Sequence, residues 1–270
     1  MLWDTHMHCN FSGDSESTPE SMVEAAILRG LDGICFTDHL DYDYPDDPDL
    51  FLLDFQKYQK KIHALQKQYG SRLAILHGIE LGLQPHLAAK HEELLKDNHF
   101  DFVIGSSHVV HRVDPYYASY FDGRTTHSAY LEYFESILEN LQAFHDFDVY
   151  GHLDYVVRYG PHTDDDYSYH QFREIIDEIL KQLITAGKGI EVNTAGLKYG
   201  LGHPNPCEDI LKRYRELGGE ILTIGSDAHK PEHIAFCFDK LPDLLRSVGF
   251  SYYTIFENRM PKFLPLRNCM

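Results

Sequence analysis

Short apolar segments alternate with segments of helical periodicity about seven times along this 270-residue chain. Strands that are buried on both faces are short and almost continuously apolar, and their alternation with helices is typical of a parallel sheet. Strands are therefore predicted over residues 2–8, 33–37, 72–80, 100–107, 149–153, 189–193 and 221–226.

Local signals mark the ends of the helical segments. Pro19 stands in the first turn of a helix that begins in the 17–20 segment, and Gly30 ends that helix. The remaining helices are predicted over residues 54–69, 87–97, 128–144, 169–186, 206–217 and 231–248. The segment 252–256 is interpreted as a short strand or a tail.

The strand–helix alternation favours one closed architecture. No linker, internal repeat or low-complexity tract divides the sequence, so residues 1–270 are expected to form a single domain. The absence of a dinucleotide-binding glycine fingerprint favours closure into a barrel over a doubly wound open sheet. Both architectures place functional residues at the carboxyl ends of the strands, so the expected location of a site is the same in either.

Composition and charge exclude several function classes. The chain has 24 Lys and Arg against 42 Asp and Glu, a formal net charge of −18, which disfavours a nucleic-acid-binding surface. No apolar run is long enough for a transmembrane helix, and the N-terminus lacks the pattern of a signal peptide. Five scattered cysteines without a CxxC pair predict free thiols and a cytoplasmic location. No oligomeric state is predicted.

The first predicted strand carries the motif Asp4-Thr5-His6-Met7-His8. Residues two apart on a strand point to the same face, so Asp4, His6 and His8 are expected to share one side. Imidazole is a common ligand of divalent transition metals, and the two histidines therefore make half of a metal site. Asp4 either orients a ligand imidazole or makes a hydrogen bond in the barrel core.

Further polar residues stand at the ends of the later strands, where the rim of a parallel barrel would bring them together. Burying many ionisable groups together costs heavily unless cations neutralise them, so the pattern predicts a metal cluster. The candidate ligands after the first strand are His39, Glu80, His108, His152, Asp227 and His229.

This ordered set resembles the polymerase and histidinol phosphatase (PHP) family of metallophosphoesterases. The matching motifs run from His6-x-His8 through Thr37-Asp38-His39 to the closing segment 225–229. The resemblance implies an α/β fold, a distorted TIM-like barrel of seven β/α units, and two or three Zn, Mn or Fe ions at the carboxyl ends of the strands. The implied ligand groups are His6, His8, Glu80 and Asp227; Glu80, His108 and His152; and His39, His229 and the residue at position 14.

Position 14 is a departure from that family pattern. Many relatives carry histidine there, whereas this chain has Asp14. An aspartate oxygen still binds divalent metals but is a harder ligand, which favours Mn²⁺ or Fe²⁺ at the third position. The alternative is that Asp14 is a solvated loop residue.

The resemblance implies hydrolysis of a phosphate ester by a hydroxide shared between metal ions. The catalytic residues assigned on this basis are Glu80, Asp227, His229 and Asp14. His229 or Asp14 could supply a proton to the leaving oxygen, although a residue that ligates a metal cannot also donate freely. As a stand-alone chain of 270 residues with sizeable inserted loops, the sequence most resembles the histidinol-phosphate phosphatases of histidine biosynthesis, and this resemblance implies L-histidinol phosphate as the substrate.

Residues in the loops after the strands are candidates for substrate binding. Arg158 and, second, Arg124 have the planar shape that clamps phosphate, but a surface salt bridge is an equal alternative for each. Tyr117 could stack on a ring of the substrate, and Glu191 and Asn193 could read a cationic amine or imidazole.

Three other functions stay open at this point. The substrate could be another small phosphate ester or a nucleotide. An amidohydrolase barrel also opens with HxH, but Glu80 on the third strand and the closing Asp-x-His argue against it. A metal-stabilised scaffold without activity would be expected to have lost ligands, and this ligand set is nearly complete.

Overall fold

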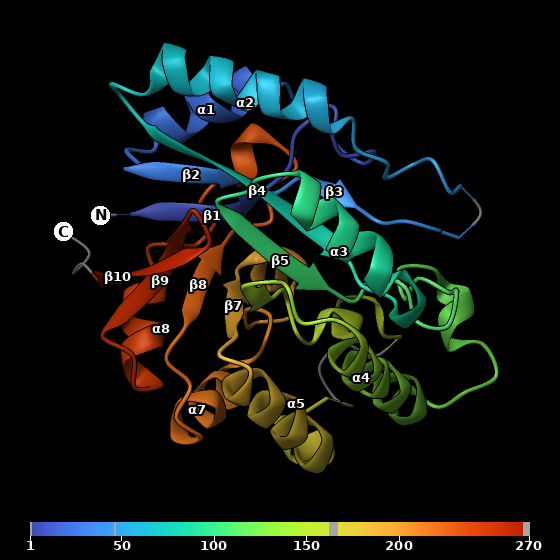
Figure 1. The fold of residues 1–270 in the computed structure, drawn as a ribbon. Helices are drawn as coiled ribbons and strands as arrows, with labels where there is room; N and C mark the ends of the chain where they lie inside the picture. The colour runs from blue at the N-terminus through green and yellow to red at the C-terminus, as the bar shows by residue number, and fades with distance from the viewer. Residues whose placement is uncertain (1, 46, 162–166, 267–270) are drawn as a thin grey trace.

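Seven parallel strands form the centre of the molecule, and helices pack around their outer side (Figure 1). The computed structural model describes residues 2–45, 47–161 and 167–266. The strands are hydrogen-bonded in the order β1-β2-β4-β5-β6-β7-β8, and every pairing along this path is parallel. Their bounds are β1 (Trp3–Met7), β2 (Gly33–Phe36), β4 (Ala74–Gly82), β5 (Phe102–Ser106), β6 (Val149–Tyr150), β7 (Gly189–Asn193) and β8 (Leu222–Gly225).

The segment that follows β8 nearly closes this sheet into a barrel. The backbone N–H of Asp227 donates to the carbonyl of His6 (2.8 Å), and that of His8 donates to the carbonyl of Ala228 (2.9 Å). Asp4 strengthens the closure, because its buried carboxylate accepts hydrogen bonds from the backbone N–H and the hydroxyl of Ser226 (2.9 and 2.5 Å). Of the two roles considered for Asp4, its contacts support the hydrogen bond in the barrel core. The predicted distorted seven-unit barrel is confirmed.

Three of the helices, α1, α2 and α4, begin where a side chain caps a free backbone N–H group. Thr18, Asp54 and Thr125 each accept a hydrogen bond from the backbone N–H three residues ahead. Within the described part of the chain, no helix is long and apolar enough to cross a membrane. The helices are α1 (Pro19–Leu28), α2 (Phe55–Tyr69), α3 (Ala88–Asp97), α4 (Thr126–Ala143), α5 (Arg173–Thr185), α6 (Ala195–Lys198), α7 (Glu208–Glu216) and α8 (Leu241–Ser247).

The prediction of one helix over residues 231–248 is wrong. A single 3₁₀ turn at Pro231–His233 is followed by turns, and α8 begins only at Leu241. Ala235 and Cys237 have φ values of 50° and 56°, which no right-handed helix contains. The backbone N–H of Ala235 donates to Asp4 instead (2.8 Å), so a long-range contact replaces a helical hydrogen bond.

Two strands of the structure are absent from the sequence prediction. The short strand β3 (His39–Leu40) pairs with β4 and places His39 opposite Glu80. The segment predicted as a short strand or tail is the strand β9 (Tyr252–Glu257), which pairs with an unpredicted antiparallel strand, β10 (Met260–Pro265).

The ion pair between Asp177 of α5 and Arg213 of α7 gives a test of the helix packing outside the barrel. Arg213 donates to both carboxylate oxygens of Asp177 (2.9 and 2.8 Å), and these hydrogen bonds lower the pKa of Asp177. A carboxylate with a lowered native pKa stabilises the fold above its unfolded pKa, and this contribution disappears as pH falls through the native pKa.

We therefore expect Asp177→Asn to lower the free energy of unfolding by about 1 kcal/mol at pH 7. The difference from the wild type should shrink as the pH falls below about 4, the ordinary pKa of aspartate. Urea denaturation at several pH values measures both effects, with Asp243→Asn on the exposed face of α8 as the neutral control. A difference that does not change with pH would contradict this role of the ion pair.

Candidate metal centre

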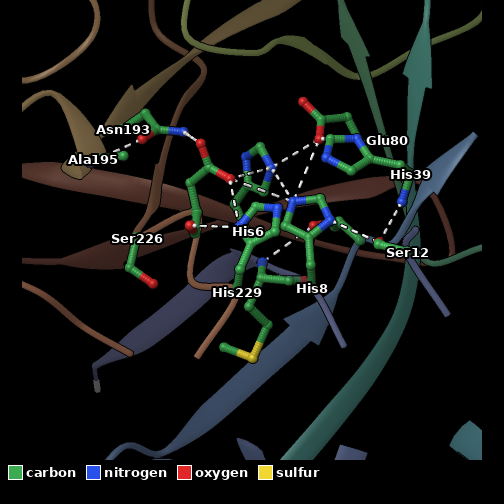
Figure 2. Close-up of polar contacts among 12 residues, drawn as sticks. His6, His8, Ser12, His39, Glu80, Asn193, Ala195, Ser226 and His229 are labelled. Carbon is green, nitrogen blue, oxygen red and sulfur yellow. Dashed lines mark hydrogen bonds and ion pairs between the residues drawn. The ribbon is translucent and has the colours of Figure 1, made fainter. Parts of the chain in front are cut away.

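The carboxyl ends of the strands bring the predicted ligands into one cluster, most of which is buried. Figure 2 shows His6, His8, His39 and His229 converging beside Glu80. These side chains are supplied by β1, β3, β4 and the segment after β8, because parallel strands end at the same rim of the barrel. His108, His152 and Asp227 complete the cluster and are buried as well.

Glu80 is the centre of the cluster. It is fully buried, and its Oε1 lies 2.9 Å from Nε2 of His152 and 3.3 Å from Nε2 of His108. Its Oε2 faces three more imidazoles, with distances of 3.1 Å to His6 Nε2, 3.1 Å to His39 Nδ1 and 3.4 Å to His8 Nε2. Burial opposes the ionisation of Glu80, but the neighbouring imidazoles hold its pKa well below the ordinary value. The two oxygens of one carboxylate thus face two different sets of imidazole rings.

The two histidines of the opening motif are held with their Nε2 atoms 3.1 Å apart. Nδ1 of His6 lies 2.6 Å from Oε1 of Glu191, and Nδ1 of His8 lies 3.1 Å from Oγ of Ser12. A partner on Nδ1 leaves Nε2 free to act as a ligand. The lone pairs on the two Nε2 atoms repel each other at this distance unless a proton or a cation lies between them.

Protonation and metal binding compete in this cluster. Burial alone would lower the pKa of His6, but the charges of Glu191 and Glu80 outweigh it and raise that pKa well above its ordinary value. Burial lowers the pKa of His8, and the neighbouring His39 and His229 lower it further. Metal ligands must be deprotonated, so metal binding displaces a proton from His6.

The residues present fit a set of divalent cations. Two buried nitrogen atoms, Nδ1 of His39 and Nε2 of His229, lack a hydrogen bond of good geometry. Each lies close to a carboxylate: His39 Nδ1 is 3.1 Å from Glu80, and His229 Nε2 is 3.0 Å from Asp14. Buried nitrogens of this kind need a partner, and a metal ion supplies one. Nitrogen and oxygen donors in this proportion suit Zn, Mn and Fe.

Asp14 lies at the predicted third position. Its Oδ2 is 3.0 Å from Nε2 of His229 and 3.6 Å from Nε2 of His39, and its side chain is 41% exposed. Ser15 and Ser17 both donate hydroxyl hydrogen bonds to the carbonyl of His229 (2.9 Å each), which ties the two loops together. This third ligand group is more open to solvent than the groups around Glu80.

Asp227 is held in a backbone conformation that non-glycine residues seldom adopt. Its φ is 53°, and the peptide hydrogen bond to His6 and an ion pair with Arg158 (2.9 Å) fix it there. Burial opposes its ionisation, but His6 and Arg158 keep its pKa well below the ordinary value. The carboxylate is therefore favoured in its charged form and is directed at His6 and His8.

Two residues that position the ligands, Asp41 and Ser12, are absent from the sequence prediction, and Glu191 is present there with a different role. Asp41 lies 3.0 Å from Nδ1 of His108 and so directs Nε2 of that ring toward Glu80. Asp41 follows His39 by two residues, directly after β3, which is the same spacing as in His6-x-His8 and is a signal that could have identified it. Ser12 and the orienting role of Glu191 had no comparable sequence signal.

The candidate substrate residues lie in two places. Arg158 and Tyr117 line a cavity of about 560 Å³ above the cluster. The other three residues, Arg124, Glu191 and Asn193, do not line this cavity. Glu191 and Asn193 are fully buried outside the cavity lining, where Asn193 donates to Glu191 (3.0 Å). Arg124 lies outside the cavity over the ring of Tyr120 and pairs with Glu132, as the salt-bridge alternative predicted.

Comparison with known proteins agrees with this fold. The model of the PHP domain family matches residues 4–195, and the chain belongs to this family. A histidinol-phosphatase from Lactococcus lactis is 33% identical over 255 residues, which is 94% of each chain. A probable histidinol-phosphatase from Clostridium acetobutylicum is 30% identical over 97% of this chain and 100% of its own.

Solved structures give the same relationship. The crystal structure of a histidinol phosphate phosphatase from Lactococcus lactis, complexed with zinc, L-histidinol and phosphate, has a TM-score of 0.90. It is 32% identical and covers 97% of this chain and 98% of its own. A putative histidinol phosphatase from Listeria monocytogenes shares the fold, with a TM-score of 0.75 at 21% identity and coverages of 88% and 99%.

The bond between Glu191 and His6 gives a test of the metal site. We expect Glu191→Gln to weaken metal binding about 10- to 100-fold, because the amide removes the charge that holds the His6 ring. Competition with a chromophoric chelator measures the affinity, and Glu220→Gln on the exposed surface is the control. Unchanged metal affinity in the Glu191 variant would argue against an orienting role.

Proposed function

We propose that this protein is a metal-dependent phosphomonoesterase that hydrolyses L-histidinol phosphate to L-histidinol and phosphate. The observation that carries the proposal is the buried cluster around Glu80, which lies beneath a cavity lined by Arg158. The substrate is supported by the 33% identity to the Lactococcus lactis histidinol-phosphatase over nearly the whole of both chains.

The protein would hold two or three divalent ions, zinc among the candidates because the related Lactococcus lactis structure contains it. Bound ions of this kind lower the pKa of coordinated water and neutralise the charge of a phosphate group. The three ligand groups are His6, His8, Glu80 and Asp227; Glu80, His108 and His152; and His39, Asp14 and His229.

Arg158 is the residue of this chain best placed to bind the phosphate. Its guanidinium donates three hydrogen bonds, to Asn205 (2.8 Å), Asp227 (2.9 Å) and Asn193 (3.1 Å). A guanidinium has five N–H groups, so two remain for phosphate oxygens in the cavity that Arg158 lines. The three protein contacts fix the plane of the side chain in advance and so lower the entropy cost of binding.

Other cavity residues complete the proposed reaction site. Lys198 lines the cavity beside Asp227, with its Nζ 3.4 Å from that residue's carbonyl, and adds a second cation for an anionic substrate. Hydrolysis adds water across the P–O bond, so the leaving alkoxide must take up a proton. Asp14 and His229 line the same cavity and are the titratable ligands most open to solvent, as a proton relay requires.

We also place the reaction in the cytoplasm. The described cysteines, Cys9, Cys35, Cys207 and Cys237, are free thiols, which suits a reducing compartment. Cys269 lies outside the described residues.

Phosphate release from L-histidinol phosphate by the purified, metal-loaded protein tests the proposal. p-Nitrophenyl phosphate and a nucleoside monophosphate test the alternative of another phosphate ester, and a hydantoin and a lactone test the amidohydrolase alternative. We expect the highest kcat/KM with L-histidinol phosphate. Absence of phosphate release from every monoester with added Zn²⁺, Mn²⁺ or Fe²⁺ would contradict the proposal.

Glu80→Ala tests whether ions share this carboxylate. Loss of a bridging ligand weakens both ions that it contacts, so we expect turnover to be abolished and metal content to fall by more than one ion per chain. Elemental analysis of the purified variant gives the metal content, and Glu220→Ala serves as the control. Loss of a single ion would argue against sharing.

Arg158→Lys tests the phosphate contact. Lysine keeps the charge but lacks the planar fork, so we expect kcat/KM to fall about 10- to 100-fold. Arg124→Lys is the matched control, because Arg124 lies outside the cavity. Equal effects of the two substitutions would count against Arg158 as the phosphate ligand.

A further inference from the structure

The wall of the cavity above the metal centre has two chemically different arcs. The loops after β6, β7 and β8 contribute basic side chains, namely Arg158, Lys198, Lys230 and His233. These three strands are consecutive in the sheet order, so their loops occupy one side of the rim. An anionic phosphate group would be attracted to this basic arc.

The other side of the rim is acidic and aromatic. The loop after β3 contributes Tyr44 and Phe51, and the loop after β5 contributes Asp114, Tyr116 and Tyr117. Strands β3 and β5 both pair with β4, so the two loops flank the same strand. The rings of Tyr44 and Phe51 pack edge to face at 4.7 Å, and those of Tyr116 and Tyr117 do so at 5.2 Å.

Asp114 differs from the other carboxylates of this cavity in having only neutral hydrogen-bond donors. The hydroxyl of Tyr44 donates to its Oδ2 (2.8 Å), and the backbone N–H of Tyr116 donates to its Oδ1 (2.7 Å). The residue is 5% exposed, and no ion pair joins it to a described basic side chain. The remaining carboxylates that line the cavity each have a basic partner: Asp14 with His229, Asp41 with His108 and Asp227 with Arg158.

An uncompensated carboxylate in a buried wall attracts a cation, and neighbouring aromatic faces attract cations as well. We propose that Asp114, with Tyr44 and Tyr116 beside it, binds the protonated amine of the substrate and so makes the enzyme selective for phosphate monoesters of small amino alcohols. This inference rests on the proposed function. The amine is assigned rather than an imidazole ring because a free imidazole is mostly neutral above pH 7.

The experiment compares Asp114→Asn with the wild type on three substrates: L-histidinol phosphate, its analogue without the amine, and p-nitrophenyl phosphate. Loss of a charged hydrogen bond should lower kcat/KM for L-histidinol phosphate about 10- to 100-fold. The other two substrates should change less than about threefold, because they offer no ammonium group. Asp122→Asn is the matched control, since Asp122 is exposed in the same loop and does not line the cavity. Metal content should be unchanged in both variants.

An equal loss on all three substrates would overturn the inference while leaving the proposed function intact. Failure of the wild type to hydrolyse L-histidinol phosphate would instead contradict the proposed function. Calorimetry on the metal-loaded wild type gives a second test that does not depend on a variant folding. L-histidinol should bind at least about 10-fold more tightly than its analogue without the amine, and equal affinities would overturn the assignment of Asp114.

Discussion

The fully buried carboxylate of Glu80 faces five imidazole rings, and the rest of the site depends on how this charge is balanced. So many ionisable groups can stay together in a protein interior only when protons or cations neutralise their mutual repulsion. The charges of Glu191 and Glu80 raise the pKa of His6 well above its ordinary value, which favours a proton on this ring. A metal ion bound by the same ring would displace that proton. Metal binding at this cluster would therefore be coupled to the protonation of the barrel interior.

A second layer of contacts determines which nitrogen of each ring faces the cluster. The Nδ1 atom of three ligand rings has a partner: Glu191 for His6, Ser12 for His8 and Asp41 for His108. Nε2 therefore points inward in all three rings. These partners come from β7, the loop after β1 and the segment after β3, so the ligand geometry requires the closed barrel. The links from Asp4 to Ser226 and from Asp227 to His6 make that closure. Fold stability and metal affinity consequently depend on some of the same residues.

The barrel and the common location of most candidate ligands could be predicted from the sequence, because both follow local rules. Short apolar runs predict the parallel strands, and most candidate ligands stand at or near the carboxyl end of one of them. Contacts between distant parts of the chain could not be predicted from the sequence. The break in the 231–248 segment depends on a bond from Ala235 to Asp4, and the role of Glu191 depends on its distance from His6. Arg124 and Arg158 are the same residue type, so the sequence alone does not distinguish their roles. In the folded chain Glu132 lies beside Arg124, whereas Arg158 lines the cavity.

The central claim is that Glu80 joins neighbouring ions into one cluster under the cavity. Anomalous diffraction at the absorption edges of zinc, manganese and iron, from crystals of the metal-loaded protein, tests this claim most directly. The account predicts at least two anomalous peaks with Glu80 oxygens as ligands, one beside His6 and His8 and one beside His108 and His152. A single peak, or peaks that Glu80 does not contact, would contradict it.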